Sequence, residues 1–490
     1  MFVSFTLCYL LITQSIKKKD MKGAKQTMEE KTTQKNEEGR LSLGQRLAYG
    51  SFEAGGMFAF SMVSTYLTVF YTDVVGLTPA VISIIMLIAR VWDGINDPMM
   101  GIICEKTRTR WGRYRPYLLF GAPVLAVTTI LAFTKPNGTG LWPAVYCGVT
   151  YILSGMAYTA TGVAGTALNN VLTRNNQERM VLISFRGVLS NIATLITGAV
   201  TMPLIMKLGD GNPSSAKGYF WAVVIFSVIG TILYWIAFAG TKEVVTPDPE
   251  KKGMPVKESL KLAFGDANIR KLLIGYLLYM CGVFGRLGIM AYFFLYVVEK
   301  PLWISIAATV MTAAMIVPNF FYPFLTARFE KKSLMLTFLM IGAVGGLVMF
   351  LGGKMMSLPV ILVGTALFHG CGAAVGGVSF GLIAEIIDDM EVRTGNRTDA
   401  IVLSVTSFAV KLGNALAGSL GVILLGAVGY VANATQTAAT KNGMSIVINL
   451  LPAGLYLIAL IPFSMIKMSR AKAAENQAIL TARHAEEQAQ

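Results

Sequence analysis

Charged side chains are scarce in this sequence. Only 14% of its 490 residues are Asp, Glu, Lys or Arg, whereas 54% are apolar. A soluble protein of this length must cover a large surface with polar groups, and this composition supplies few of them. The balance therefore argues against a large soluble protein.

Residues for metal and acid–base chemistry are equally scarce. The chain has two histidines, and it lacks HExxH, GxSxG and a Gly-rich phosphate-binding loop after a strand. We therefore expect no enzyme activity, no metal site and no organic cofactor. Five cysteines without paired spacing, four of them in or at apolar runs, indicate packing residues rather than a disulfide framework: Cys8, Cys104, Cys147, Cys281 and Cys371.

Long apolar runs separated by short polar loops make up most of the chain. A helix needs about 20 apolar residues to cross a bilayer, where its backbone groups must pair within the segment. Such runs fall near 46–72, 79–103, 115–134, 142–168, 180–206, 218–240, 268–298, 303–326, 333–352, 357–387, 400–428 and 443–468. They predict an all-α polytopic membrane protein with twelve transmembrane helices.

A polar stretch with three prolines and several charges divides these runs into two sets of six. The predicted organisation is a tail (1–44), an N-terminal bundle (45–240), a linker (241–266), a C-terminal bundle (267–468) and a helical, solvated tail (469–490). Residues 2–13 are apolar and Lys17–Lys19 follow them, which is the reverse of a signal peptide. We expect residues 1–20 to be an incorrectly assigned start, with Met21 beginning an ordinary tail.

The net charge of +15 could indicate a nucleic-acid partner, but its placement indicates a membrane. Basic residues crowd the linker and every second loop, as in the loop between the second and third runs, whereas the other loops carry single lysines. This positive-inside bias places both termini and the linker in the cytoplasm. We expect a monomeric transport unit in the plasma membrane, contacting lipid and a small solute but no nucleic acid.

Ionisable residues inside apolar runs are costly and indicate function. The second run contains Asp93 and Asp97, four apart and so on one helix face. Two such carboxylates need a cation, a proton or a basic partner, and Asn96 adds an amide oxygen. Lys411 in the eleventh run has no acid nearby in sequence, and Asp93 is its candidate partner. The alternatives are a pair between Asp97 and a loop residue such as Arg113, and a static Lys411 bridge.

Four further embedded groups suggest substrate contacts. Arg186 and Arg286 carry planar guanidinium groups that suit hydroxyl or acidic oxygens, and either could instead pair with Glu53. Glu53 could bind substrate hydroxyls or form a bridge. His369 lies among Gly and Ala and is more often a packing residue than a proton carrier.

An ordered set of motifs resembles the glycoside–pentoside–hexuronide:cation symporters of the major facilitator superfamily. The resemblance runs from about Leu43 to Ile466 and rests on YLTVFYTDVVGL, ARVWDGINDPMMG, TRTRWGRYRPYLLFG, YILSGMAYT, ALNNVLTRNNQER, RLGIMAYFFLYVV and IIDDMEVRTGNRTDAI, with Lys411 following. It implies two six-helix bundles rocking around a central site. It also implies that Asp93 and Asp97 serve the cation site, with Lys411 and Thr159 beside it and Arg186 in a sugar pocket.

The sequence departs from melibiose-type members of that family at four positions. Acids of those proteins correspond to Met57 and Gly162 here, and their aromatic stacking residues correspond to Thr166 and Gly377. The missing acid at Gly162 weakens the case for Na⁺ and favours H⁺.

The sequence therefore predicts symport of a sugar, glycoside or related solute with H⁺ or Na⁺. The predicted substrate contacts are Glu53, Tyr158, Thr166, Arg186, Arg286 and Gly377, and the predicted coupling residues are Asp93, Asn96, Asp97, Thr159 and Lys411. The alternative is the same fold carrying a bulkier, amphiphilic or aglycone-bearing solute, and a sensor built on a transport fold stays open.

Overall fold

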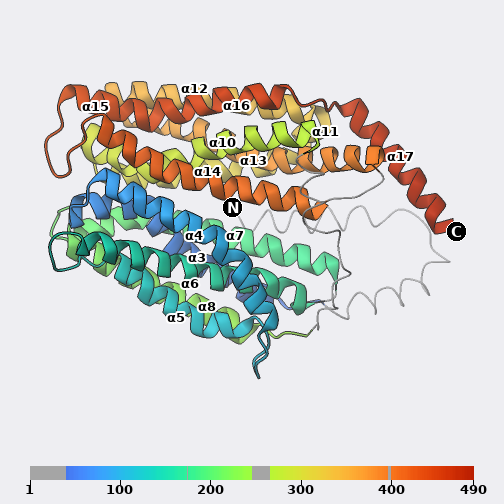
Figure 1. Ribbon diagram of the computed structural model, residues 1–490, viewed down its shortest axis with the longest axis horizontal. Helices are drawn as coiled ribbons and strands as arrows, with labels where there is room; N and C mark the ends of the chain where they lie inside the picture. Colours follow the sequence, from blue (N-terminus) through green and yellow to red (C-terminus); the bar gives the residue numbers. More distant parts are fainter. Residues whose placement is uncertain (1–39, 174, 245–264, 395–398, 490) are drawn as a thin grey trace.

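A computed structural model describes residues 40–173, 175–244, 265–394 and 399–489. These residues form helices joined by short loops (Figure 1). The N-terminal half contains α3 (Leu43–Val69) continued by η2 (Phe70–Val75), α4 (Pro79–Lys106), α5 (Arg115–Ala132), α6 (Trp142–Leu172), α7 (Asn176–Leu208) and α8 (Ala216–Gly240).

The C-terminal half repeats this pattern. It contains α10 (Ala267–Tyr292) continued by η3 (Phe293–Val297), α11 (Trp303–Arg328), α12 (Lys331–Lys354), α13 (Leu358–Thr394) and α14 (Asp399–Ala427), and its last span joins α15 (Ala438–Ser445), η4 (Ile446–Leu450) and α16 (Leu451–Ser464). Each of the twelve predicted runs coincides with one of these segments. The predicted tail 1–44 and linker 241–266 lie largely outside the described residues.

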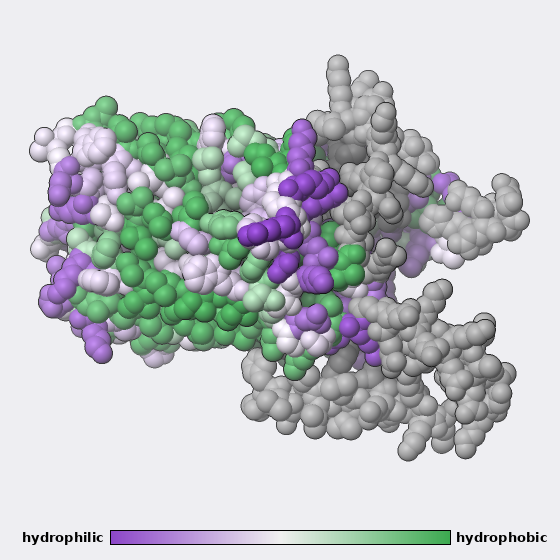
Figure 2. Space-filling view, turned by 90° about the horizontal axis from the view of Figure 1, so that it is seen from below, coloured by the Kyte–Doolittle hydropathy of each residue, from purple (hydrophilic) through white to green (hydrophobic). Residues whose placement is uncertain are grey.

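The helices carry their apolar side chains around the outside as well as inside. Within the described ranges, ten helices are long and apolar enough to cross a membrane, and α11 contributes a shorter apolar stretch, Trp303–Pro318. Figure 2 shows a broad hydrophobic band with hydrophilic residues gathered at both ends of the molecule. Since a soluble helix hides its apolar face, this all-round exposure is the surface of a membrane protein.

Capping groups fix several helix ends. Ser42 and Gln45 form a capping box at the start of α3, and the side chains of Asn175 and Asp266 accept backbone N–H groups at α7 and α10. Glu243, just after α8, accepts the backbone N–H groups of Arg113, Tyr114 and Arg115 at 2.7–3.1 Å. It thereby supplies hydrogen-bond acceptors for backbone N–H groups at the start of α5, which have no acceptor within the helix itself.

The two halves lie side by side, the blue-to-green one below and the yellow-to-red one above (Figure 1). We name the end where α8 finishes and α10 begins the linker end, and the opposite end the far end. Helix α4 packs along α14, α3 against α10 and α7 against α11. Ser83 donates a hydrogen bond to the carbonyl of Ser419 at 2.9 Å, and Thr68 to that of Gly288 at 2.9 Å.

The last helix, α17 (Arg470–Ala489), was predicted to be a solvated tail helix. It is helical, but it packs against α13 (Figure 1). Lys472 forms an ion pair with Asp389 at 2.6 Å, and Asn476 donates to the same carboxylate at 3.2 Å. The buried carboxylate therefore anchors this helix, which its polar sequence did not indicate.

Candidate functional site

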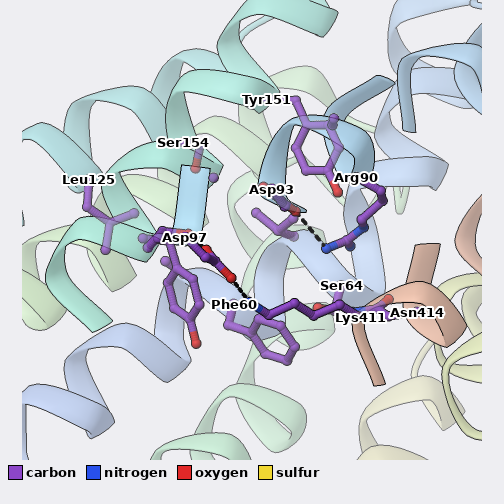
Figure 3. Close-up of a pocket in the computed structure, with 16 residues that line it drawn as sticks. Phe60, Ser64, Arg90, Asp93, Asp97, Leu125, Tyr151, Ser154, Lys411 and Asn414 are labelled. Carbon is purple, nitrogen blue, oxygen red and sulfur yellow. Dashed lines mark hydrogen bonds and ion pairs between the residues drawn. The ribbon is translucent and has the colours of Figure 1, made fainter. Parts of the chain in front are cut away.

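Helix α4 places three ionisable side chains on the face that it turns toward α14. Arg90, Asp93 and Asp97 are spaced three and four residues apart, so they lie one above another. They face a cavity of about 260 Å³ between the two bundles (Figure 3). Its other lining residues are Ala59, Phe60, Val63, Ser64, Ala89, Leu125, Tyr151, Ser154, Gly155, Tyr158, Thr159, Lys411 and Asn414.

Each carboxylate in this first cavity has its own cationic partner. Arg90 Nη1 lies 3.2 Å from Asp93 Oδ2, whereas Lys411 of α14 forms an ion pair with Asp97 (Figure 3). Thr159 Oγ1 of α6 donates to Asp97 Oδ1 at 3.0 Å. The predicted Lys411–Asp93 pair is therefore wrong, because Lys411 lies level with Asp97 and Arg90 already holds Asp93.

The alternative, a pair between Asp97 and a loop residue such as Arg113, is also wrong, because the cation paired with Asp97 is Lys411 of α14. The backbone N–H of Arg113 donates to Glu243 at the linker end, in the cap of α5. The Lys411–Asp97 pair stays accessible from the cavity, since 51% of the lysine side chain and 21% of the aspartate side chain are exposed. An ion pair that a solute or solvent can reach can open far more easily than one sealed in a dry core.

A second cavity, of about 230 Å³, adjoins the first. It is lined by Phe52, Glu53, Gly56, Asp97, Tyr158, Thr159, Gly162, Val163, Thr166, Arg186 and Tyr234. Asp97, Tyr158 and Thr159 line both cavities. The structure thus brings together four of the six residues predicted to contact substrate and places them beside Asp97.

One ion pair spans this second cavity, which we name the candidate substrate cavity. Arg186 Nε of α7 lies 2.8 Å from Glu53 Oε2 of α3. The guanidinium also sits over the ring of Phe52, with 5.4 Å from its central carbon to the ring centroid. Of the two partners considered for Glu53, the structure selects Arg186.

Three predicted site residues lie apart from both cavities. Arg286 is fully buried, and its Nη1 lies 2.9 Å from His369 Nε2 between α10 and α13. Asn96 is fully buried, with no hydrogen-bond partner for its amide in the described part of the chain. Gly377 of α13 does not line either cavity. These placements do not support direct solute contact by Arg286 or Gly377.

The structure adds cavity residues that the sequence prediction omitted. Arg90 could have been found, because it lies three residues before Asp93 and inside a membrane span. Asn414 follows Lys411 by three residues and faces the same cavity. Ser64 and Phe60 of α3 gave no such signal, because only the packing of α3 within the bundle turns them toward the cavity.

A second cross-bundle cluster lies at the far end, around Asp73 of η2. Tyr296 of η3 donates to its carboxylate at 2.6 Å, Tyr430 of the α14–α15 loop donates to the other oxygen, and Thr72 donates at 2.7 Å. Asn433 donates to the Asp73 carbonyl at 2.6 Å. Burial raises the pKa of the Tyr430 hydroxyl, so it remains a donor at neutral pH.

With this geometry established, comparison with known proteins identifies the chain. A family model described as MFS/sugar transport protein matches residues 48–470. The chain belongs to this family. It is therefore a multi-pass secondary transporter of the major facilitator superfamily, and the resemblance to glycoside–pentoside–hexuronide:cation symporters is confirmed.

Curated relatives cover nearly the whole chain. The isoprimeverose transporter of Lactiplantibacillus pentosus is 32% identical over 448 residues, which are 91% of this chain and 92% of that protein. The glucuronide carrier protein homolog of Escherichia coli (strain K12) is 28% identical over 430 residues, covering 86% and 92%.

Solved structures confirm the fold. A bacterial homolog of the human lysosomal transporter Spinster, in an inward-facing and unoccupied conformation, superimposes with a TM-score of 0.63 at 12% identity, covering 87% of this chain and 98% of that one. A D-xylose-proton symporter gives 0.59 at 16% identity, covering 86% and 97%. At these identities the likeness concerns the fold alone.

Proposed function

We propose that this transporter imports an uncharged sugar or glycoside together with a proton. The observation that carries the proposal is the Lys411–Asp97 ion pair, which joins the two bundles inside a cavity. The sugar transport family and the two adjoining cavities support a sugar-sized solute.

The ion pair provides a means of coupling. Protonation of Asp97 removes its negative charge, so Lys411 loses its partner and one link between the bundles is broken. Any step that favours the protonated form also favours the conformation in which the bundles have parted, because the two equilibria are linked. Thr159 holds Asp97 through a hydroxyl that can donate to the ionised carboxylate and accept from the protonated one.

The donor set favours a proton over Na⁺. A sodium ion requires several oxygen ligands, but the carboxylates of Asp93 and Asp97 are each already paired with a basic side chain. Gly162, where melibiose-type relatives carry an acid, also lines the substrate cavity and offers no side-chain oxygen. Transferring a proton to Asp97 requires only one oxygen and no coordination shell.

The cavity walls favour a solute with polar and apolar faces. The rings of Phe60 and Tyr158 stack with their centroids 5.8 Å apart where the cavities meet, and such rings suit the apolar face of a sugar. Ala59, Val63 and Leu125 extend the apolar wall. This wall favours, as a second candidate, a glycoside that carries an apolar aglycone.

Transport by proteoliposomes tests the proposed coupling. The purified protein is reconstituted, and uptake of radiolabelled xylosides and glucosides is measured under an imposed pH gradient, an imposed Na⁺ gradient, or neither. We expect accumulation with the pH gradient only. Accumulation driven by Na⁺ at constant pH would overturn proton coupling, and equilibration without accumulation under both gradients would overturn symport.

We also propose that the protein lies in the cell membrane with both termini in the cytoplasm. Arg108, Arg110, Arg113, Lys331 and Arg393 all belong to the linker end, at which the positive-inside bias places the cytoplasm. A tag after residue 490 should resist protease added to intact cells and be cleaved after the cells are opened. Cleavage in intact cells would reverse the orientation.

A further inference from the structure

Among the described residues, the charges in the two cavities cancel. Glu53 pairs with Arg186, Asp93 with Arg90, and Asp97 with Lys411, and no other ionisable acid or base lines either cavity. A solute without charge can enter such a site and leave this balance unchanged. A solute with a carboxylate or sulfonate brings one negative charge, and Arg186, the cation that lines the second cavity, is already paired with Glu53.

Glu53 is the acid that such a solute would meet at Arg186 in the substrate cavity. Its carboxylate lies against the Arg186 guanidinium, the group best suited to bind an anionic oxygen. Only 17% of the Glu53 side chain and 28% of the Arg186 side chain are exposed, so water screens this pair poorly. An anionic solute must therefore displace Glu53 from Arg186 or remain beside a like charge.

A hydroxylated neutral solute meets no such obstacle. The ion pair uses Arg186 Nε, so the two terminal amino groups of the guanidinium lie outside this bond. A sugar hydroxyl can accept from the guanidinium and donate to the carboxylate, so the pair stays intact while it binds. Thr166 and Tyr158 line the same cavity and add two further hydroxyl groups.

We propose that Glu53 is a specificity-determining residue, which excludes anionic glycosides by keeping Arg186 neutralised. This inference rests on the proposed function, because it concerns which sugars the same cavity admits. It assigns to Glu53 a role as a charge filter, a form of selection against the wrong solute. The exclusion then depends on one carboxylate rather than on the shape of the cavity.

Two probes that differ only in charge test the proposal. The para-nitrophenyl β-D-glucoside and the para-nitrophenyl β-D-glucuronide have the same ring and aglycone, but the second carries a carboxylate. Binding is measured as ligand-induced thermal stabilisation of the purified protein, and uptake is measured in proteoliposomes. In the wild type we expect the glucoside to bind at least about tenfold more tightly than the glucuronide.

Glu53→Gln retains the size of the side chain and removes its charge, which leaves Arg186 without its counter-ion. We expect this variant to bind the glucuronide about tenfold more tightly than the wild type does, a change of about 1.4 kcal/mol. The gain should disappear in the double variant Glu53→Gln/Arg186→Gln. Glu299→Gln is the matched control, since Glu299 pairs with Lys441 at the far end, outside both cavities.

Equal binding of the two probes by the wild type would overturn the proposal, as would an unchanged preference in Glu53→Gln. Tighter binding of the glucuronide that persists in the double variant Glu53→Gln/Arg186→Gln would also overturn it. The same experiment can contradict the proposed function separately. If Glu53→Gln binds the glucuronide more tightly but no gradient drives uptake of either probe, the role of Glu53 is supported and the symport mechanism is wrong.

Discussion

Lys411 crosses from the C-terminal bundle to Asp97, while Asp93, one turn away on the same helix, is held by Arg90 of its own helix. The two carboxylates therefore differ in what their neutralisation would change. Neutralising Asp97 breaks a contact between bundles, whereas neutralising Asp93 breaks a contact within α4. This asymmetry separates the two acids, which in the sequence look equivalent.

We expect Asp97→Asn to abolish accumulation driven by a pH gradient while leaving solute exchange largely intact. Asparagine imitates the protonated carboxyl group, so the site can turn over without the proton that couples it. Uptake under an imposed gradient and counterflow at equal pH measure the two activities. Accumulation at the wild-type level by Asp97→Asn would show that the coupling proton binds elsewhere.

Asp73→Asn should weaken closure of the far end. The variant replaces a charged acceptor that binds Tyr296 and Tyr430 with a neutral amide, and hydrogen bonds to charged groups contribute about 1.5–3 kcal/mol. We expect several-fold faster labelling of a cysteine placed at Ser64 by a membrane-impermeant reagent added on the far-end side.

The control for that experiment is Asp210→Asn. Asp210 is an exposed far-end acid that pairs with Lys217 within the N-terminal bundle, so its removal breaks no contact between bundles. Labelling at Ser64 should not change in this control. If Asp73→Asn labels no faster than Asp210→Asn, the Asp73 cluster does not hold the far end closed.

Glu243→Ala should destabilise the N-terminal bundle. The substitution leaves three backbone N–H groups at the start of α5 without an acceptor, and loss of such a cap lowers stability by about 1–2 kcal/mol. A lower midpoint of thermal unfolding in detergent would confirm this. Glu243→Gln keeps an acceptor oxygen, so its midpoint of thermal unfolding should fall less. An equal fall in both variants would show that the negative charge of Glu243, rather than its hydrogen bonds, stabilises the bundle.

Asp266 should make a pH-dependent contribution to stability. Burial alone would raise its pKa, but hydrogen bonds from Arg393 and from the backbone N–H groups of Ile269 and Asn268 lower it overall. A carboxyl group with a lowered folded-state pKa stabilises the fold above its unfolded value of about 3.9, and this contribution is lost as the pH falls through the folded value.

The measurement for Asp266 compares thermal unfolding of the wild type with that of Asp266→Asn across the acidic range. Asparagine still caps a helix, so the comparison isolates the ionised carboxylate. We expect the wild type to be more stable at neutral pH and the two proteins to converge below about pH 4. A difference that stays constant with pH would contradict this origin.

Local sequence predicted much of the two cavities but little of the closure at the far end. Asp93 and Asp97 stood out because any acid in a membrane span needs a reason, and their spacing put them on one face. Asp73 did not, since it lies at the end of a span, where an acid is unremarkable. Its partners Tyr296 and Tyr430 are more than 200 residues away in the chain.

The spans and their division into two sets of six follow from the amino-acid sequence alone, because crossing a bilayer imposes a length and an apolar composition that each segment must meet alone. The sequence also shows which ionisable groups lie within the membrane. Which of these groups meet depends on how the helices pack: Lys411 meets Asp97, Arg186 meets Glu53, and Arg286 meets His369 rather than the cavity. Periodicity fixes positions around one helix axis, but it contains no information on how far two helices are shifted along each other.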